Sequence, residues 1–241
     1  MMSFPRLQPE RRREMEPDEP ERKGLRKGVY LIPSIFTALN LFAGFYSLMS
    51  AMSGFRLLGI GGTANVAQAI VHFDYAAMAI GWALLCDILD GRIARMTRST
   101  TEIGIQLDSI ADVVSFGLAP AVLAYVWGAG TLFDQGSNIH QLGWFLSFMY
   151  LICGGFRLAR FNVQASRPRL IAEGTPKVDK QSFVGLPIPV AGGMIAAIVH
   201  FHPAPIKFFP QHLQLFAVLM MVLVGFLSVL MVSTIRFTSL K

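Results

Sequence analysis

Long apolar stretches without a charged residue recur along the chain and alternate with short polar connections. They cover residues 29–52, 75–86, 113–133, 141–156, 182–199 and 213–235. Most reach the roughly 18 to 20 residues that a helix needs to cross the hydrocarbon core of a bilayer. The stretch at 75–86 becomes long enough if a single helix extends over residues 67–93. The pattern therefore predicts six transmembrane helices.

Composition agrees with a membrane protein. Charged residues make up 15% of the chain and apolar residues 53%, whereas an ordinary soluble domain carries about 25% charged residues. No internal repeat is visible, and no shift in composition divides the chain after residue 28. We therefore expect an all-α integral membrane bundle over residues 29–241, preceded by a tail at residues 1–28.

The basic residues are distributed unevenly across this arrangement. Of the 21 Lys and Arg residues, all but Arg56 and Lys207 lie in segments that a six-span chain places on one side. The positive-inside rule then predicts that both termini are cytoplasmic, in a bacterium on the inner face of the inner membrane. Topology accounts for the net charge of +6, so we expect no nucleic-acid partner.

The tail is polar and rich in Arg, Glu and Pro. It contains no apolar run of the kind found in cleaved signal peptides, so we expect no cleaved leader. Residues 21–27 allow two interpretations, either a short helix on the membrane surface that meets anionic headgroups or a flexible, soluble tail. Cys86 and Cys153 lie inside apolar stretches, and we expect both to be packing residues.

Four aspartates lie where the second predicted helix ends and the third begins. Asp87 and Asp90 are three residues apart, and Asp108 and Asp112 are four apart, so on helices each pair shares a face. If the two helices are antiparallel neighbours joined by a turn around residues 97–101, the two pairs converge. The result is a polar pocket near the cytoplasmic boundary of the membrane.

Unpaired carboxylates in such a place repel one another and are costly to desolvate, so a cation must lie between them. Oxygen ligands without a nearby Cys or His favour Mg²⁺, Mn²⁺ or Ca²⁺ over zinc, and we expect one or two ions. Interfacial ion pairs with Arg92 or Arg95 are the alternative. A cation transporter would place its acids near the bilayer centre in paired halves, which this chain does not suggest.

Small residues and an arginine accompany the aspartates. Gly91 and Ala94 clear a surface beside the second aspartate, and Gly104 lies four residues before the third. Arg95 is able to bind phosphate oxygens in a bidentate manner. The combination suits a nucleotide diphosphate, although glycines of this kind also allow close packing of helices.

These eight residues have the spacing D-x2-D-G-x2-A-R-x8-G-x3-D-x3-D, which is similar to the signature of the CDP-alcohol phosphatidyltransferases. The resemblance implies a six-helix fold, usually dimeric, in which Asp87, Asp90 and Asp108 bind divalent metal. It implies that Asp112 is both a ligand and the general base. It also implies a CDP-linked lipid donor and an alcohol acceptor, with CMP leaving.

Segments outside the signature resemble the branch of the family that joins CDP-diacylglycerol to L-serine. These are PSIFTALNLFAGFYS, VVSFGLAPA, CGGFRLARFN and FVGLPIPVAGG, and Ser34 stands where Asn is commoner. By resemblance, Thr37 and Asn40 line the donor pocket; the alternative is an ordinary interhelical hydrogen bond. Glycerol 3-phosphate or an inositol phosphate remains possible as the acceptor.

Candidate acceptor residues follow the last aspartate and end the fourth predicted helix. Ser115 and Gly117 lie about one turn beyond Asp112 and are candidates for shaping the acceptor pocket. Arg157 and Arg160 are able to bind the carboxylate of serine or the phosphate of the donor, and Asn162 to orient a polar group nearby. The alternative for the arginines is that they anchor the helix by reaching lipid headgroups.

Overall fold

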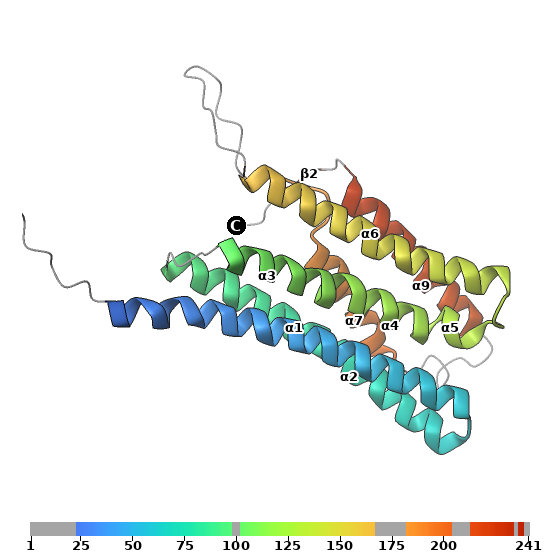
Figure 1. Cartoon of the computed structure of the whole chain (residues 1–241). Coiled ribbons are helices and arrows are strands. Elements are labelled where there is room, and N and C mark those ends of the chain that lie inside the picture. Colours follow the sequence, from blue (N-terminus) through green and yellow to red (C-terminus); the bar gives the residue numbers. More distant parts are fainter. Residues whose placement is uncertain (1–22, 98–101, 167–181, 204–212, 234–235, 239–241) are drawn as a thin grey trace, which may run out of the picture.

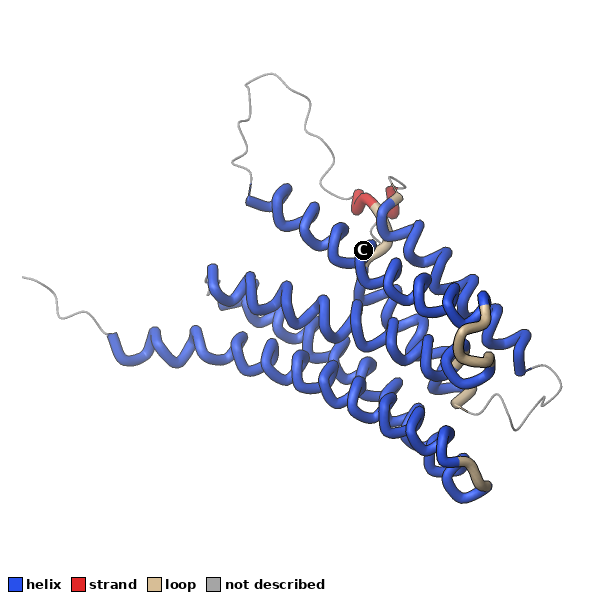
Figure 2. Tube along the Cα trace, turned by 45° about the vertical axis from the view of Figure 1, so that its right-hand side comes forward, coloured by secondary structure: helices blue, strands red, loops and turns tan. Residues whose placement is uncertain are grey.

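The structure is a computed structural model, and it describes residues 23–97, 102–166, 182–203, 213–233 and 236–238. Long helices lie side by side and make up almost all of it (Figure 1). The helices are α1 (Lys23–Ile60), α2 (Thr63–Thr97), α3 (Glu102–Asp112), the π-helix η1 (Val113–Leu118), α4 (Ala119–Trp127), α5 (Ala129–Leu132), α6 (Asn138–Ser166), α7 (Ile188–Phe201) and α9 (Leu213–Val232). The strands β1 (Ser182–Val184) and β2 (Arg236–Thr238) form a small antiparallel sheet, drawn in red in Figure 2.

Five helical segments are long and apolar enough to cross a membrane. They are Ile35–Ile60, Thr63–Ile93, Ile103–Leu132, Asn138–Val163 and Gln214–Val232. They confirm five of the predicted spans, including the single helix expected over residues 67–93. The remaining predicted span, at residues 182–199, corresponds to α7, which has 14 residues.

The predicted start of this span at residue 182 is wrong. Residues 182–184 pair with β2, and the helix begins only at Ile188, with Pro187 as its N-cap. Proline disfavours a helical conformation in the residue before it, and it is tolerated in the first turn of a helix. Pro187 and Pro189 therefore fix the start of α7.

A tight turn joins α1 to α2, so that the two helices pack as an antiparallel hairpin. Gly61 and Gly62 form the turn with φ of 74° and 89°, a conformation that costs glycine little. Along the hairpin, Ser47 Oγ donates a hydrogen bond to the Ala76 carbonyl at 2.8 Å. This bond sets the register that brings the N-terminal half of α1 beside the aspartates of α2.

Some predictions concern segments that the structure covers only in part. Residues 1–22, most of the turn at 97–101 and most of the basic segment at 166–181 lie outside the described residues. Residues 23–27, for which we predicted either a surface helix or a flexible tail, are helical and continuous with α1.

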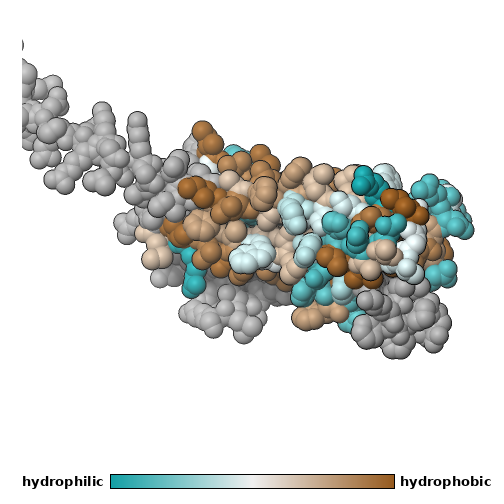
Figure 3. All heavy atoms as spheres, turned by 90° about the horizontal axis from the view of Figure 1, so that it is seen from below, coloured by the Kyte–Doolittle hydropathy of each residue, from teal (hydrophilic) through white to brown (hydrophobic). Residues whose placement is uncertain are grey.

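Large apolar side chains face outward and small ones pack inside. Phe42, Trp82 and Phe156 are each more than 60% exposed, whereas fourteen alanines of the described residues are buried in the core. Figure 3 shows broad apolar areas on one face of the molecule, with hydrophilic residues gathered toward its right-hand end. An exposed apolar surface of this extent fits a helical bundle surrounded by lipid.

Candidate active site

Three of the four aspartates converge as the spacing predicts. Asp87 from α2 and Asp108 and Asp112 from α3 each offer a carboxylate oxygen, and these oxygens lie within 4.8 Å of one another. Asp112 is buried and the other two are half-buried. The three negative charges repel one another across this space.

Asp90 is held differently from the other three aspartates. Its buried carboxylate accepts a hydrogen bond from Thr37 Oγ1 of α1, and it is not one of the three that offer oxygens within 4.8 Å of one another. Its charge still acts on Asp108 and Asp112. Asp90 therefore belongs to the same electrostatic cluster while also linking α1 to α2.

Asn40 approaches the cluster from α1, on the side of Asp112. Its Nδ2 donates to Asp112 Oδ1 at 3.5 Å, and its backbone carbonyl accepts a hydrogen bond from Ser115 Oγ at 2.8 Å. The interhelical hydrogen bonds that we considered for Thr37 and Asn40 are therefore present, and both bonds end on aspartates of the signature. The same two hydrogen bonds therefore hold α1 against its neighbours and position two aspartates of the site.

The sequence did not predict the π-helix η1, which begins directly after Asp112. Short π-helical segments are rare and are often found at functional sites. Here η1 carries Ser115, Phe116 and Gly117 into the buried interior. Ser115 reaches α1, whereas a Cβ on Gly117 would lie 3.1 Å from Leu151 of α6. Gly117 thus lies in a close helix contact.

The α6 arginines occupy different surroundings. Arg157 is only 9% exposed, and the charges of Asp112 and Arg160 act on it. Arg160 is half-buried, and its guanidinium approaches Gly185 near the start of α7. The predicted acceptor residue Asn162 donates a hydrogen bond to Ser109 Oγ of α3 at 2.8 Å. Arg157 is therefore the α6 side chain that carries charge into the interior.

The remaining signature residues border the cluster on α2 and α3. Gly91 is exposed and Gly104 is half-buried. The side chains of Ala94 and Arg95 lie outside the described part of the structure, although their backbone belongs to α2.

A family model described as CDP-alcohol phosphatidyltransferase matches residues 30–239 of the chain. The chain belongs to this family. The match includes every described membrane helix together with the whole aspartate signature. It therefore extends well beyond the residues on which the resemblance was first based.

Curated members of the CDP-alcohol phosphatidyltransferase family include similar proteins from distant organisms. The CDP-diacylglycerol–serine O-phosphatidyltransferase of Helicobacter pylori (strain ATCC 700392 / 26695) is 33% identical over 217 residues, which cover 88% of this chain and 74% of that protein. A Bacillus subtilis (strain 168) protein of the same name is 33% identical over 166 residues, or 69% of this chain and 76% of that one. In Saccharomyces cerevisiae the identity is 36% over 165 residues, covering 68% and 51%.

The candidate ligand atoms in the aspartate cluster of this phosphatidyltransferase suit a hard divalent cation. The cluster offers carboxylate oxygens, as Mg²⁺, Mn²⁺ and Ca²⁺ prefer. Within the described residues, no Lys or Arg side chain forms an ion pair with these aspartates. The ion pair with Arg92 that we considered as an alternative is therefore not seen in the described part, and the side chain of Arg95, the other residue of that alternative, lies outside it.

An apolar groove of about 610 Å³ runs between α1 and α2 on the outer surface. Phe36 and Leu89 lie at one end of the groove, next in sequence to Thr37 and Asp90. Tyr46 and Tyr75 lie at the other end, close to the level of the Ser47 to Ala76 hydrogen bond. The groove thus leads from the aspartate cluster into the depth of the membrane.

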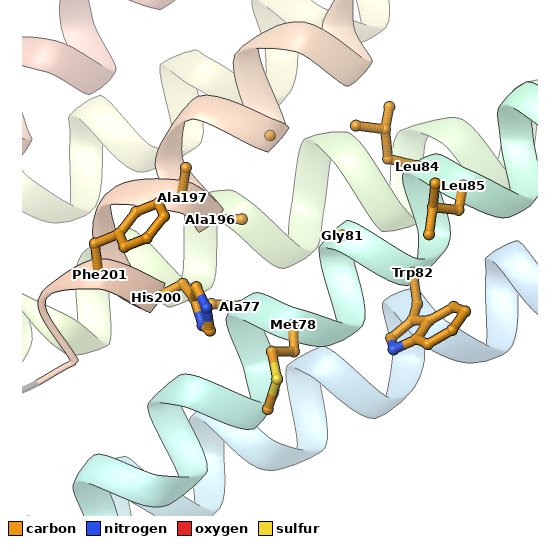
Figure 4. A pocket seen from close by; sticks show the side chains of 11 residues that line it. Ala77, Met78, Gly81, Trp82, Leu84, Leu85, Ala196, Ala197, His200 and Phe201 are labelled. Carbon is orange, nitrogen blue, oxygen red and sulfur yellow. The ribbon is translucent and has the colours of Figure 1, made fainter.

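A second, smaller groove of about 350 Å³ lies between α2 and α7 (Figure 4). Met78, Trp82 and Leu85 of α2 border both grooves. The second groove extends to His200, whose Nδ1 lies 2.6 Å from Asp74 Oδ1 at the end of the bundle away from the signature. His72 and Asp74 therefore lie apart from the aspartate cluster.

Proposed function

We propose that this protein transfers the phosphatidyl group of CDP-diacylglycerol to the hydroxyl of L-serine, forming phosphatidylserine and releasing CMP. The observation that carries the proposal is the set of three carboxylate oxygens within 4.8 Å where α2 and α3 meet. The Helicobacter, Bacillus and yeast relatives are each named as CDP-diacylglycerol–serine O-phosphatidyltransferases, which supports serine as the acceptor.

Asp87, Asp90, Asp108 and Asp112 would together hold two divalent ions, Mg²⁺ or Mn²⁺, with Ca²⁺ as a further possibility. When bound, the ions neutralise the diphosphate of the donor and the departing CMP. Asp112 would accept the proton of the serine hydroxyl at its carboxylate oxygen. The hydroxyl oxygen then forms a bond to the lipid-side phosphorus while the bond from phosphorus to CMP breaks.

The other signature residues would bind the donor. In this proposal, Thr37 lines the donor pocket and holds the Asp90 carboxylate there by a hydrogen bond. Arg95 binds phosphate oxygens of the donor. Gly91, Ala94 and Gly104 would leave room for the cytidine diphosphate beside the helices. The groove between α1 and α2 would take an acyl chain of the donor, because it is apolar and begins beside Thr37 and Asp90.

The acceptor would lie between Asp112 and α6. Arg157 is buried within range of the Asp112 charge, which supports a role in binding a carboxylate. Ser115, Gly117, Arg160 and Asn162 would shape this side of the site. In the structure, Ser115 and Asn162 hold neighbouring helices by hydrogen bonds, which fits positioning better than direct contact.

We further propose six membrane crossings, both termini in the cytoplasm, and a place in a bacterial inner membrane. The start of α7 lies near Arg160, and Trp127 Nε1 donates to the His202 carbonyl just beyond its end at 3.2 Å. These contacts support α7 as a crossing from the arginine end of α6 to the far end of α4. A homodimer, which the family resemblance implies, completes the proposal and is testable by light scattering.

The decisive experiment is an acceptor comparison with the purified, full-length protein. We expect CMP release from CDP-diacylglycerol with L-serine and Mn²⁺ or Mg²⁺, and none after chelation of the metal. CMP release with glycerol 3-phosphate or an inositol phosphate, but not with serine, would reassign the acceptor. Metal flux into liposomes without any turnover of the CDP-lipid would instead point to a transporter.

A further inference from the structure

Two buried polar atoms on residues that interact with Asp112 have no hydrogen-bond partner within the described residues. They are Oδ1 of Asn40 and Nε of Arg157. Asn40 is 1% exposed and Arg157 is 9% exposed, so bulk water is not an obvious partner for either. Buried polar groups in native proteins nearly always have a partner, which suggests that a ligand completes these bonds.

The hydrogen bonds around Asn40 determine which polar atom of its side chain has no hydrogen-bond partner within the described residues. An ionised carboxylate only accepts hydrogen bonds, so the amide nitrogen of Asn40 must be the group that faces Asp112. Ser115 fixes the backbone of Asn40 from the η1 side. The atom that remains unpaired is therefore an acceptor, and it lies beside the carboxylate to which we assign the role of base.

Two hydrogen bonds determine the level of Arg157 along the bundle. Tyr150 OH donates to the Phe116 carbonyl at 3.0 Å, and Asn162 Nδ2 donates to Ser109 Oγ at 2.8 Å. Arg157 lies between these two α6 residues, and Asp112 lies between their two partners on the antiparallel segment. Arg157 shares the helix face of Tyr150, seven residues away. Its guanidinium is thus level with Asp112.

An acceptor atom and a cation that both lie near a carboxylate match the groups of a zwitterionic hydroxy amino acid. We infer that Asn40 Oδ1 accepts a hydrogen bond from the ammonium of serine, and that the Arg157 guanidinium binds its carboxylate, while its hydroxyl lies at Asp112. Three contacts to different substituents of the α-carbon also distinguish the two enantiomers of serine. The inference rests on the proposed function, and it makes Asn40 and Arg157 the residues that determine acceptor specificity.

Acceptor analogues test this assignment with the wild-type protein and need no variant. Ethanolamine lacks the carboxylate, 3-hydroxypropionate lacks the ammonium, and D-serine has both in the wrong arrangement. We expect kcat/KM for each to be lower than for L-serine by about 100-fold or more, because a buried group is left unpaired. If 3-hydroxypropionate or D-serine reacted as well as L-serine, the assignment would be wrong.

Variants then locate each contact. We expect Arg157→Gln to lower kcat/KM for L-serine by about 100-fold and for ethanolamine by less than about threefold, with Arg157→Lys in between. Asn40→Leu should affect L-serine far more than 3-hydroxypropionate. Arg56→Gln, at the opposite end of α1, is the matched control and should leave all acceptors unchanged.

The readouts separate this inference from the proposed function. If the wild-type protein released no CMP with L-serine, the proposed function itself would fail. If it did, but Arg157→Gln raised KM for CDP-diacylglycerol instead of KM for L-serine, Arg157 would be a donor residue and the inference would be overturned. Binding of Mn²⁺ alone, followed by electron paramagnetic resonance, shows whether each variant keeps its folded aspartate cluster.

Discussion

Asp112 combines three features that no other aspartate of the cluster has together, although Asp90 is also buried. It is buried, it accepts a hydrogen bond from Asn40, and it immediately precedes the π-helix η1. We predict that Asp112→Asn lowers kcat by about 10² to 10⁴-fold, because it removes a general base and one metal ligand while keeping the shape of the side chain. CMP release measures the loss, and circular dichroism should show an unchanged helix content.

Asp74→Asn is the matched control for this prediction, since Asp74 lies on α2 at the far end of the bundle and pairs with His200. It should retain turnover. Near-normal activity of Asp112→Asn would remove Asp112 from the proposed mechanism.

Gly44 allows α1 to approach η1 closely. A Cβ at this position would lie 2.8 Å from the Cα of Ser115 and nearer still to its hydroxyl. Gly44→Ala should therefore lower the free energy of unfolding by about 1 to 3 kcal/mol, as expected for overpacking, and disturb the hydrogen bond between Ser115 and Asn40. Titration with sodium dodecyl sulfate in mixed micelles measures the stability.

Gly59 on the same helix provides the control for Gly44, since a Cβ there meets nothing within 4 Å in the described structure. Alanine is favoured over glycine in a helix by about 1 kcal/mol. Gly59→Ala should therefore be neutral or stabilising. Equal destabilisation by both substitutions would show that close packing is not what requires Gly44.

Residue spacing predicted part of the site and missed the rest for a physical reason. The intervals of three and four between aspartates determine a shared face on any helix, so the convergence of Asp87, Asp108 and Asp112 was predictable. The unpaired atoms of Asn40 and Arg157 were not, because each depends on how α1 and α6 are rotated against η1. No spacing within one helix carries that information.

At the scale of elements, α2 was predicted well and two other segments were not. A continuous apolar run with polar ends was sufficient to predict α2. The strand β1 was missed because residues 182–184 are uncharged and continue directly into the run of α7, and its pairing partner β2 lies more than 50 residues later. The π-helix η1 is an adjustment of backbone hydrogen bonding that leaves no hydrophobic period of its own.

The groove between α1 and α2 predicts how the enzyme responds to the chain length of its lipid donor. The α2 side of the groove spans residues 75–89, or about 21 Å at 1.5 Å per residue, which exceeds one leaflet of a hydrocarbon core about 30 Å thick. Ala43→Phe should fill it and lower kcat/KM for a long-chain CDP-diacylglycerol on the order of tenfold. The dioctanoyl donor should be affected less.

Ala38→Phe is the matched control, because Ala38 is exposed on the same helix and does not line the groove. Steady-state rates with the two donors, measured in mixed micelles, give the comparison. Equal losses with both donors, or an equal loss in Ala38→Phe, would argue against an acyl chain in the groove.

At the scale of the whole molecule, the number of crossings determines where the chain after α7 lies. With 14 residues, α7 is about 21 Å long, less than the hydrocarbon core. The strand β1 makes up part of the missing length, because it directly precedes α7. It pairs with β2, which follows α9. The start of α7 and the end of α9 therefore lie on the same side, which is possible only if α7 and α9 run in opposite directions.

Single cysteines introduced into a variant that lacks Cys86 and Cys153 test this topology. With six crossings, Gln135→Cys and Gln214→Cys lie outside, and a membrane-impermeant maleimide should label both in intact spheroplasts. Gln106→Cys, beside the aspartates, and Ser233→Cys, after α9, should react only after permeabilisation. If α7 did not cross, Gln214→Cys would react together with Gln106→Cys. The C-terminus would then lie opposite the active site, and both the sixth span and the cytoplasmic position of that terminus would be wrong.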